Sequence, residues 1–318
     1  MLIAIAAIAL IFISFCPVLV VQWAAKILRA SQLIAVQPVF ELWQKTILTP
    51  AFFIVLGFTL LMEQLLPVQK KARFWTVSFA QDLVWFFYEA ILHAAVIVTF
   101  IAWLMQFYYA HCNFLTIYAA NRLPGWARFV FGVLALDFLY WLQHWINHKV
   151  PWLWQFHAVH HSQKELSFFS DFRYHVFEYV IRETIMVVPF LILQVDIPTI
   201  VYFSVFRSWY TRFYHGNIKI NMGPLRYILV TPQSHRVHHS IELRHYDQNF
   251  GSLFSIWDFL FGTQYKGFDE YPQTGIPDPE FPHEKTKGLS LLLTPLIQLA
   301  YPFRRISQQI RQMIRPKP

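Results

Sequence analysis

Long apolar runs constrain the fold of this chain more than any other feature of its sequence. Four runs occupy about residues 1–22, 46–66, 83–108 and 128–147, and each is near the roughly 20 residues that cross a bilayer as a helix. The hydrophobic share of 56% and the mean hydropathy of +0.38 exceed what soluble proteins ordinarily show. Because backbone groups in lipid must be satisfied within their own segment, the runs predict an all-α, multi-pass integral membrane bundle.

Two further apolar stretches differ from these runs. Residues 176–206 are interrupted by Asp196-Ile197-Pro198, which predicts a helical hairpin that dips into the bilayer or two short tilted helices. Residues 289–302 are too short to cross and are followed by basic residues, so we expect an interfacial segment with a basic tail. The first run lacks a basic n-region and a convincing cleavage site, which favours an uncleaved membrane segment.

The net charge of +8 indicates a membrane surface rather than a nucleic acid, because the basic residues are scattered or lie beside apolar runs. The positive-inside rule favours a cytoplasmic location for residues 67–82 and for the basic C-terminal tail. The run 128–147 then ends at the cytoplasmic face. Lys26, Arg29 and Lys45 conflict with this orientation, so the direction of the first run stays open.

Eight of the fourteen histidines fall in three short clusters. One cluster ends the run 128–147, and the other two lie in the polar segments 149–175 and 207–288. Neutral imidazole binds zinc, copper, iron and nickel, so histidines that recur at one-turn spacing indicate a metal centre. The clusters are His144 and His148; His157, His160 and His161; and His235, His238 and His239.

The spacing within the clusters narrows the kind of centre. Histidines at i, i+3 and i+4 share one face of a helical turn. Zinc proteases need a glutamate directly after the first histidine of an i, i+4 pair, and Trp145 stands there, which excludes that class. Eight histidines also exceed the four ligands of one tetrahedral zinc, so two metals are indicated. We expect the site at a membrane face, where the clusters can meet.

Asp137 lies two turns before His144 on the same predicted helix face, inside an apolar run. A carboxylate in this setting needs a partner, and a hydrogen bond from a ligand imidazole would supply one. The alternative is an aspartate paired with a tyrosine hydroxyl or with another helix.

The order His-x-x-x-His, His-x-x-His-His and a second His-x-x-His-His resembles the fatty acid hydroxylase superfamily, also called the sterol desaturase family. The resemblance covers roughly residues 80 to 265. It departs from the family's usual pattern at Trp145, where an arginine is usual, and at Ser167-Phe-Phe-Ser170, where relatives often carry asparagine and threonine. The matching stretches are Asp137–His148, His157–Ser162, Arg173-Tyr-His175 with Glu178, His215-Gly-Asn217, Pro232–Ser240, Asn249-Phe-Gly251 and Trp257-Asp258-x-x-Phe261-Gly262-Thr263.

The resemblance implies a non-haem centre of two iron ions that uses dioxygen to attack an unactivated C–H bond of a membrane lipid. The eight cluster histidines are the expected catalytic residues, and Asp137, Asn249 and Asp258 are expected to support cofactor binding. The implied metal ligands are His144, His148, His157, His160, His161, His215, His235, His238 and His239, with His175 as a further candidate.

The same resemblance favours hydroxylation of a fatty acyl, sphingoid, sterol or ether lipid. Desaturation by the same centre is the near alternative, and a non-catalytic membrane metal-binding protein is the alternative from another class. Electrons are expected from an external ferredoxin, cytochrome or reductase, because the chain carries no haem-binding, flavin or nicotinamide fingerprint.

These expectations divide the chain into three parts. Residues 1–80 are expected to form N-terminal membrane helices and a linker, and residues 81–265 a catalytic domain with two metals. Residues 266–318 are expected to form a proline-rich segment, an interfacial helix and a basic tail. The predicted fold is thus an all-α integral membrane bundle with a cytosolic histidine-rich di-metal cap.

Overall fold

The computed structural model describes residues 50–69, 76–92, 96–118, 122–195, 197–283 and 289–314. Over these residues the regular structure is helical, with β-bridges only as isolated pairs. The all-α prediction is therefore confirmed for the described part of the chain. The first predicted run, 1–22, lies outside it.

The second and third runs fold as three helices. Helix α3 (Pro50–Leu65) falls within the run 46–66, whereas the run 83–108 corresponds to α4 (Val77–Leu92) and α5 (Val98–Phe107). Helix α4 begins earlier than predicted, and its first turns carry the fully buried Gln81 and Asp82. Asp82 forms a buried ion pair with Arg173 of the polar part, so this end of α4 packs on protein. A π-helical stretch, Tyr108–Cys112, follows α5.

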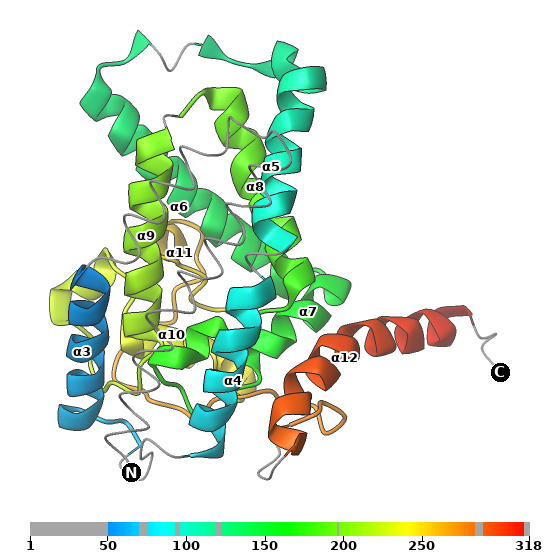
Figure 1. The fold of residues 1–318 in the computed structure, drawn as a ribbon. Coiled ribbons are helices and arrows are strands. Elements are labelled where there is room, and N and C mark those ends of the chain that lie inside the picture. Colours follow the sequence, from blue (N-terminus) through cyan, green and yellow to red (C-terminus); the bar gives the residue numbers. More distant parts are fainter. Residues whose placement is uncertain are drawn as a thin grey trace.

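The fourth run forms α6 (Gly125–Lys149). Among the described helices, α6 is the one that is long and apolar enough to cross a membrane by length and composition, and Phe53–Leu65 of α3 is a shorter apolar helix. These helices alone leave the multi-pass bundle a prediction. Figure 1 shows α5, α6, α8 and α9 rising together at one end of the molecule.

The predicted break near Pro198 is confirmed. Helix α8 (Val176–Leu193) ends where Gln194 adopts a left-handed conformation with φ of 52°, and α9 begins at Ile197. A left-handed residue stops helix propagation, and Pro198 suits the first turn of the next helix, where its missing N–H is not needed. Both helices pack against α6. The stretch 176–206 therefore belongs to two helices that follow each other in the sequence, α8 and the first part of α9.

The polar part of the fold is built from shorter helices. Val150 alone separates α6 from α7 (Pro151–His161), so these two helices form a tight corner and pack on each other. Thr231 and Ser234 cap the start of α10 (Pro232–His238) through reciprocal hydrogen bonds. The remaining short elements are α11 (Ile256–Leu260) and 3-10 turns at Asn113–Leu115, Phe168–Phe172, Gly223–Tyr227 and Leu243–His245.

The C-terminal helix is longer than predicted. Helix α12 (Leu289–Ile314) runs through both the apolar segment and the basic residues, with two prolines inside it. Its first half contacts α4 and α7, and its end projects away from the body of the protein (Figure 1). Arg305 pairs with Glu280, which fixes the basic part of the helix to the preceding segment.

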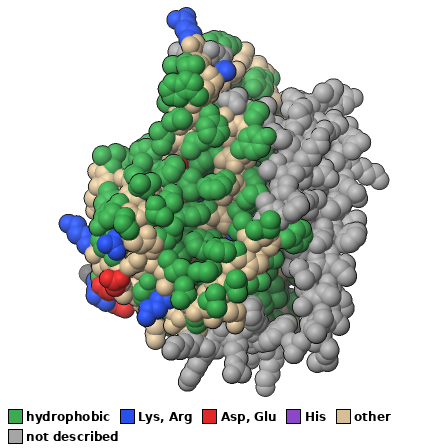
Figure 2. Space-filling view, turned by 90° about the vertical axis from the view of Figure 1, so that its left-hand side faces the viewer, with side chains coloured by type: hydrophobic (Ala, Val, Ile, Leu, Met, Phe, Trp, Pro, Cys, Tyr) green, Lys and Arg blue, Asp and Glu red, His purple; other side chains and the backbone are tan. Residues whose placement is uncertain are grey.

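One face of the molecule is strongly apolar. Figure 2 shows hydrophobic side chains covering the side that carries α3 and α9, with charged side chains gathered toward its ends. Ile54 of α3 is 69% exposed and Phe206 of α9 is 54% exposed. Soluble proteins rarely expose apolar patches of this extent, so the face fits contact with lipid.

Candidate metal centre

Nine histidines from four segments meet in the polar part of the fold. They form two groups, and within each group the potential ligand nitrogens lie within 4.8 Å of one another. We call them the five-histidine cluster and the four-histidine cluster. The first contains His144, His148, His157, His161 and His238, and the second contains His160, His215, His235 and His239.

The two His-x-x-His-His motifs exchange their middle histidines. His157 and His161 of α7 belong to the five-histidine cluster, whereas His160 between them belongs to the other. In the same way His238 leaves the cluster that holds His235 and His239. The sequence predicted that all three histidines of each motif lie on one helix face, and the structure corrects this prediction. Each helical residue turns by about 100°, so the i+3 and i+4 side chains diverge and can serve two neighbouring sites.

The clusters adjoin each other. The rings of His161 and His239, one from each cluster, are stacked with their centroids 4.3 Å apart. His160 and His239, which share the four-histidine cluster, have centroids 4.7 Å apart. The spacing between clusters is thus as short as the spacing within one. The arrangement can hold two ions as close neighbours.

Backbone carbonyls fix the tautomers of two rings in the four-histidine cluster, those of His160 and His215. His160 Nδ1 donates to the carbonyl of Arg173 at 3.3 Å, and His215 Nδ1 donates to that of Thr211 at 2.7 Å. A ring nitrogen that donates carries the proton, so the Nε2 atoms of both rings present lone pairs. These two Nε2 atoms lie 3.3 Å apart, and His235 Nε2 lies 2.8 Å from that of His215. Converging lone pairs of this kind suit a bound cation.

The five-histidine cluster is oriented in the same manner. His144 and His238 donate their Nδ1–H groups to the carbonyls of Phe250 and Gln248, at 3.0 and 2.8 Å. Their Nε2 atoms are buried and have no hydrogen-bond partner. Buried polar atoms are nearly always satisfied, so two unsatisfied lone pairs in one cluster point to an absent ligand.

The ring-nitrogen spacings also fit a metal. His161 Nε2 lies 3.2 Å from His148 Nε2 and 3.1 Å from His157 Nε2. Two nitrogens about 2.0–2.1 Å from one ion are about 3 Å apart when their bonds meet near a right angle. The donor set of both clusters therefore fits metal ions that favour imidazole.

Burial keeps six of the clustered imidazoles uncharged. It lowers the pKa of His160, His161, His235 and His239 well below the usual value, and it lowers that of His238 to about 3. Burial also lowers the pKa of His215. A neutral imidazole retains the lone pair that a metal needs, so these rings are ready to bind metal at neutral pH.

Glu178 is a site residue that the sequence reasoning did not assign. Its Oε1 accepts from His157 Nδ1 at 2.8 Å and from Asn147 Nδ2 at 3.0 Å. A carboxylate behind a ligand imidazole fixes the tautomer and increases its basicity. The available signal was an acidic residue in the first turn of the apolar helix α8, within a stretch that resembles the family.

His175 does not join either cluster, contrary to the prediction that it could be a tenth ligand. Its Nδ1 accepts from the backbone N–H of Phe177 at 3.0 Å and so caps the start of α8. Its Nε2 lies 2.9 Å from the carbonyl of Leu299 in α12, to which it donates. Both ring nitrogens are therefore occupied, and His175 ties α8 to α12.

Asp137 does not contact a histidine, contrary to the predicted imidazole partner. Its carboxylate accepts from the backbone N–H groups of Leu253 and Phe254 at 2.9 and 3.1 Å, and from Trp257 Nε1 at 2.8 Å. The loop that follows α10 lies against α6 next to Asp137, and its N–H groups donate hydrogen bonds to both carboxylate oxygens. Asp137 therefore anchors the closing loop to α6.

Asp258 and Asn249 hold the same loop. Asp258 accepts from the backbone N–H groups of Phe250 and Gly251 at 2.8 and 2.7 Å. Asn249 donates to the carbonyl of Ser234 in α10 at 2.9 Å. Since the carbonyl of Phe250 orients His144, both residues act on the centre through the loop. A Cβ on Gly251 would lie 2.8 Å from Val230, so only glycine fits this close approach.

The departures from the family pattern occupy supporting positions. Ser167 and Ser170 form a capping box, and both hydroxyls donate to Asp82 at 3.2 and 2.8 Å. Trp145 stacks on Trp141 with ring centroids 6.4 Å apart. Neither departure occupies a ligand position.

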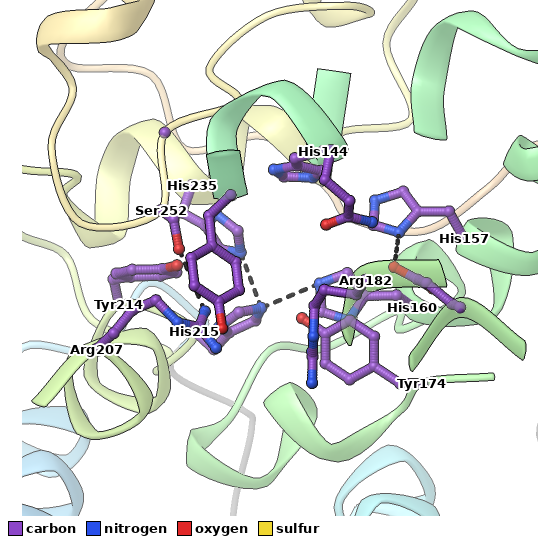
Figure 3. Close-up of a pocket in the computed structure, with 14 residues that line it drawn as sticks. His144, His157, His160, Tyr174, Arg182, Arg207, Tyr214, His215, His235 and Ser252 are labelled. Atoms are coloured by element: carbon purple, nitrogen blue, oxygen red, sulfur yellow. Dashed lines mark hydrogen bonds and ion pairs between the residues drawn. The ribbon is translucent and has the colours of Figure 1, made fainter. Parts of the chain in front are cut away.

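A cavity of about 40 Å³ lies between the two clusters. Histidines of both clusters line it, together with side chains from α6, α8 and α9 (Figure 3). On another side, His148, His161 and His238 line a larger cavity of about 560 Å³ that also touches the segment 275–279. The centre is thus reached by a small cavity near the apolar helices and a large one in the polar part.

Comparisons with known proteins agree with this architecture. Residues 129–263 match the family model for fatty acid hydroxylase. Ornithine lipid hydroxylase OlsE of Rhizobium tropici is 30% identical over 198 residues, which cover 62% of this chain and 56% of that protein. Alkylglycerol monooxygenase of Homo sapiens is 34% identical over 132 residues, which cover 41% of this chain and 29% of that protein.

Cholesterol 25-hydroxylase of Homo sapiens is 29% identical over 136 residues, which cover 42% of this chain and 50% of that protein. The alignments span about half of these relatives' lengths, or less. No solved structure matches the chain. All nine clustered histidines lie within residues 129–263, the part of the chain that matches the fatty acid hydroxylase family model.

Proposed function

We propose that this protein is a membrane-bound non-haem di-iron oxygenase that hydroxylates an unactivated C–H bond of a lipid. The observation that carries the proposal is the sorting of nine histidines into two adjoining clusters beside one cavity. The fatty acid hydroxylase domain and relatives named as lipid hydroxylases favour iron and a lipid over other metals and substrates.

The reaction balances with an external reductant. One C–H bond, dioxygen, two electrons and two protons give an alcohol and one water. Iron ions bound in the two clusters would supply the activation of dioxygen. The electrons would come from a separate ferredoxin, cytochrome or reductase, which is a partner that the proposal requires.

The protein's own residues supply position and environment. The nine clustered histidines would hold the ions. Glu178 and backbone carbonyls would fix five of their rings, those of His144, His157, His160, His215 and His238. The small cavity between the clusters would bring the C–H bond to the centre and exclude bulk water. Rigid ligands preserve the short distances on which such chemistry depends.

The apolar face and α6 support a membrane setting. We propose that the chain crosses the membrane several times and that the metal centre lies at its cytoplasmic face. A lipid in the bilayer would then reach the cavity without leaving its apolar surroundings. The centre lies at the C-terminal end of α6, which suits this position.

Lipid analysis of cells that express the chain tests the proposal. Under ¹⁸O₂, cells with the wild-type chain should accumulate a lipid that has gained one labelled oxygen atom. His160→Ala should abolish that product, while His111→Ala, which changes an exposed histidine outside both clusters, should retain it. A lipid that has instead lost two hydrogens would identify a desaturase, since desaturation releases both oxygens as water. Bound metal with neither product would indicate a non-catalytic metal-binding protein.

A further inference from the structure

The small cavity beside the metal centre has a cationic wall. Arg207 of α9 and Arg182 of α8 line it together with histidines of both clusters (Figure 3). Arg182 is paired with the adjacent Glu183 at 2.9 Å. A wall with two guanidinium groups is unusual for a site that receives only an alkyl chain.

Arg207 lacks a comparable partner. Its guanidinium lies 3.9 Å from the centroid of the Tyr140 ring and donates to Ser252 Oγ at 3.2 Å. Its Nε is buried without a hydrogen-bond partner, and the described part of the chain places no carboxylate oxygen within 4.0 Å of it. Asp137, which also interacts with Arg207 electrostatically, already accepts three hydrogen bonds from the closing loop.

A second donor in the same cavity is unsatisfied. Gln143 of α6 lines the cavity, is only 4% exposed, and its Nε2 has no hydrogen-bond partner. Glu178 contributes the unsatisfied acceptor Oε2, but its other oxygen binds His157. Figure 3 shows Arg207 and Ser252 on one side of the cavity and His157 on the other. The cavity therefore offers unsatisfied donors from two helices, Arg207 of α9 and Gln143 of α6.

An alkyl group could not satisfy these donors. The Arg207 guanidinium is half-buried and has no carboxylate partner among the described residues, and an apolar ligand would complete its removal from water at a large cost in free energy. A carboxylate or phosphate accepts only, and the guanidinium fork matches the geometry of either group. The cavity is therefore complementary to an anion that contacts Arg207.

We propose that Arg207 and Gln143 bind an anionic head group of the lipid, either a carboxylate or a phosphate, and so place a head-group-proximal C–H bond at the metal centre. This inference rests on the proposed lipid hydroxylation. The cavity holds only about 40 Å³, enough for a few water-sized groups, so the anion and the reacting carbon must be near neighbours. The lipid tail would extend away from the centre.

Binding to the full-length protein loaded with zinc tests the inference without turnover. The probes are dihexanoyl phosphatidic acid, N-decanoylglycine and 1-decanoylglycerol, measured by titration calorimetry in detergent. One of the two anionic probes should bind at least tenfold more tightly than the neutral glycerol ester, and its identity distinguishes phosphate from carboxylate. Equal affinities for all three probes would overturn the inference.

Variants assign the preference to the cavity. Arg207→Gln should remove the preference: the affinity for the anionic probe should fall at least tenfold, and the affinity for the neutral probe should stay unchanged. Arg304→Gln, an exposed change on α12, should retain the wild-type values. If Arg207→Gln fails to hold metal, two other variants test the assignment. Arg207→Lys should keep part of the preference for the anionic probe. Gln143→Leu should weaken binding of the anionic probe. An unchanged preference in these variants would refute the assignment.

The position of oxygen insertion separates this inference from the proposed function. With the iron-loaded protein, fragmentation of the product should place the new oxygen in the head-group-proximal part of the lipid. An oxidised lipid with oxygen at the methyl end, together with no preference for anions, would overturn the inference and leave the proposed function standing. Selective anion binding without any oxidised lipid would contradict the proposed function alone.

Discussion

The Nε2 atoms of His160 and His215 lie 3.3 Å apart although both rings donate their Nδ1–H groups to backbone carbonyls. Two lone pairs thus face each other in a buried site, where water cannot separate them. The contact is unfavourable without a cation and favourable with one. The fold has therefore organised ligands whose mutual repulsion only a bound ion relieves.

Metal should consequently stabilise the folded protein. An ion that binds only the folded state at a hundred times its dissociation constant adds about 2.7 kcal/mol to the free energy of unfolding. Thermal unfolding followed by tryptophan fluorescence should shift upward with zinc and downward with a chelator. His111→Ala should show the same shift and His160→Ala a smaller one. A melting temperature that does not change with zinc would contradict a metal site in the histidine clusters.

His238 and His239 are adjacent in the chain but belong to different clusters. Replacing His238 by alanine leaves four ligands in its cluster, whereas replacing His239 leaves three in the smaller one. We therefore expect His239→Ala to lose about one ion per chain and His238→Ala to retain more metal. Metal analysis after removal of loosely bound ions checks this order. Equal losses of metal in the two variants would contradict it.

Glu178 should control the affinity of the five-histidine cluster. Glu178→Ala removes the acceptor that orients His157, and loss of such a partner typically weakens metal binding by about 10- to 100-fold. Competition with a chromophoric chelator measures the change. Glu280→Ala, an exposed change ahead of α12, serves as the control. An unaltered affinity in Glu178→Ala would show that the carboxylate does not support the ligand.

Asp137 should matter for stability. Asp137→Ala leaves one buried and two part-buried N–H donors without their acceptor, and the buried donor of Leu253 alone costs about 1–3 kcal/mol in the free energy of unfolding. We expect the melting temperature to fall sharply, whereas the exposed Asp269→Ala should leave it near the wild-type value. Retained stability with weakened metal binding would instead favour the imidazole contact predicted from the sequence.

The sequence was most informative where one local rule decides the structure. Apolar length and the proline at 198 predicted α6 and the break between α8 and α9, because both depend on nearby residues. The histidine spacing predicted which residues could be ligands. It could not predict the exchange of His160 and His238 between clusters, because that exchange depends on how α7 and α10 face each other.

Long-range contacts account for the corrected residues. Asp137 binds a loop more than a hundred positions away, and His175 binds the carbonyl of Leu299 across a similar distance. Nothing in the local sequence distinguishes these partners from a ligand role. Glu178 was overlooked for the same reason, since its partner His157 lies on another helix.

The metal content of the purified wild-type protein tests the central claim most directly. After anaerobic loading with ferrous iron and removal of unbound metal, mass-spectrometric metal analysis should find two ions per chain, because each cluster supplies at least four imidazoles. A value of one ion or none would contradict the account, as would two ions retained when His160 and His235 are both replaced by alanine.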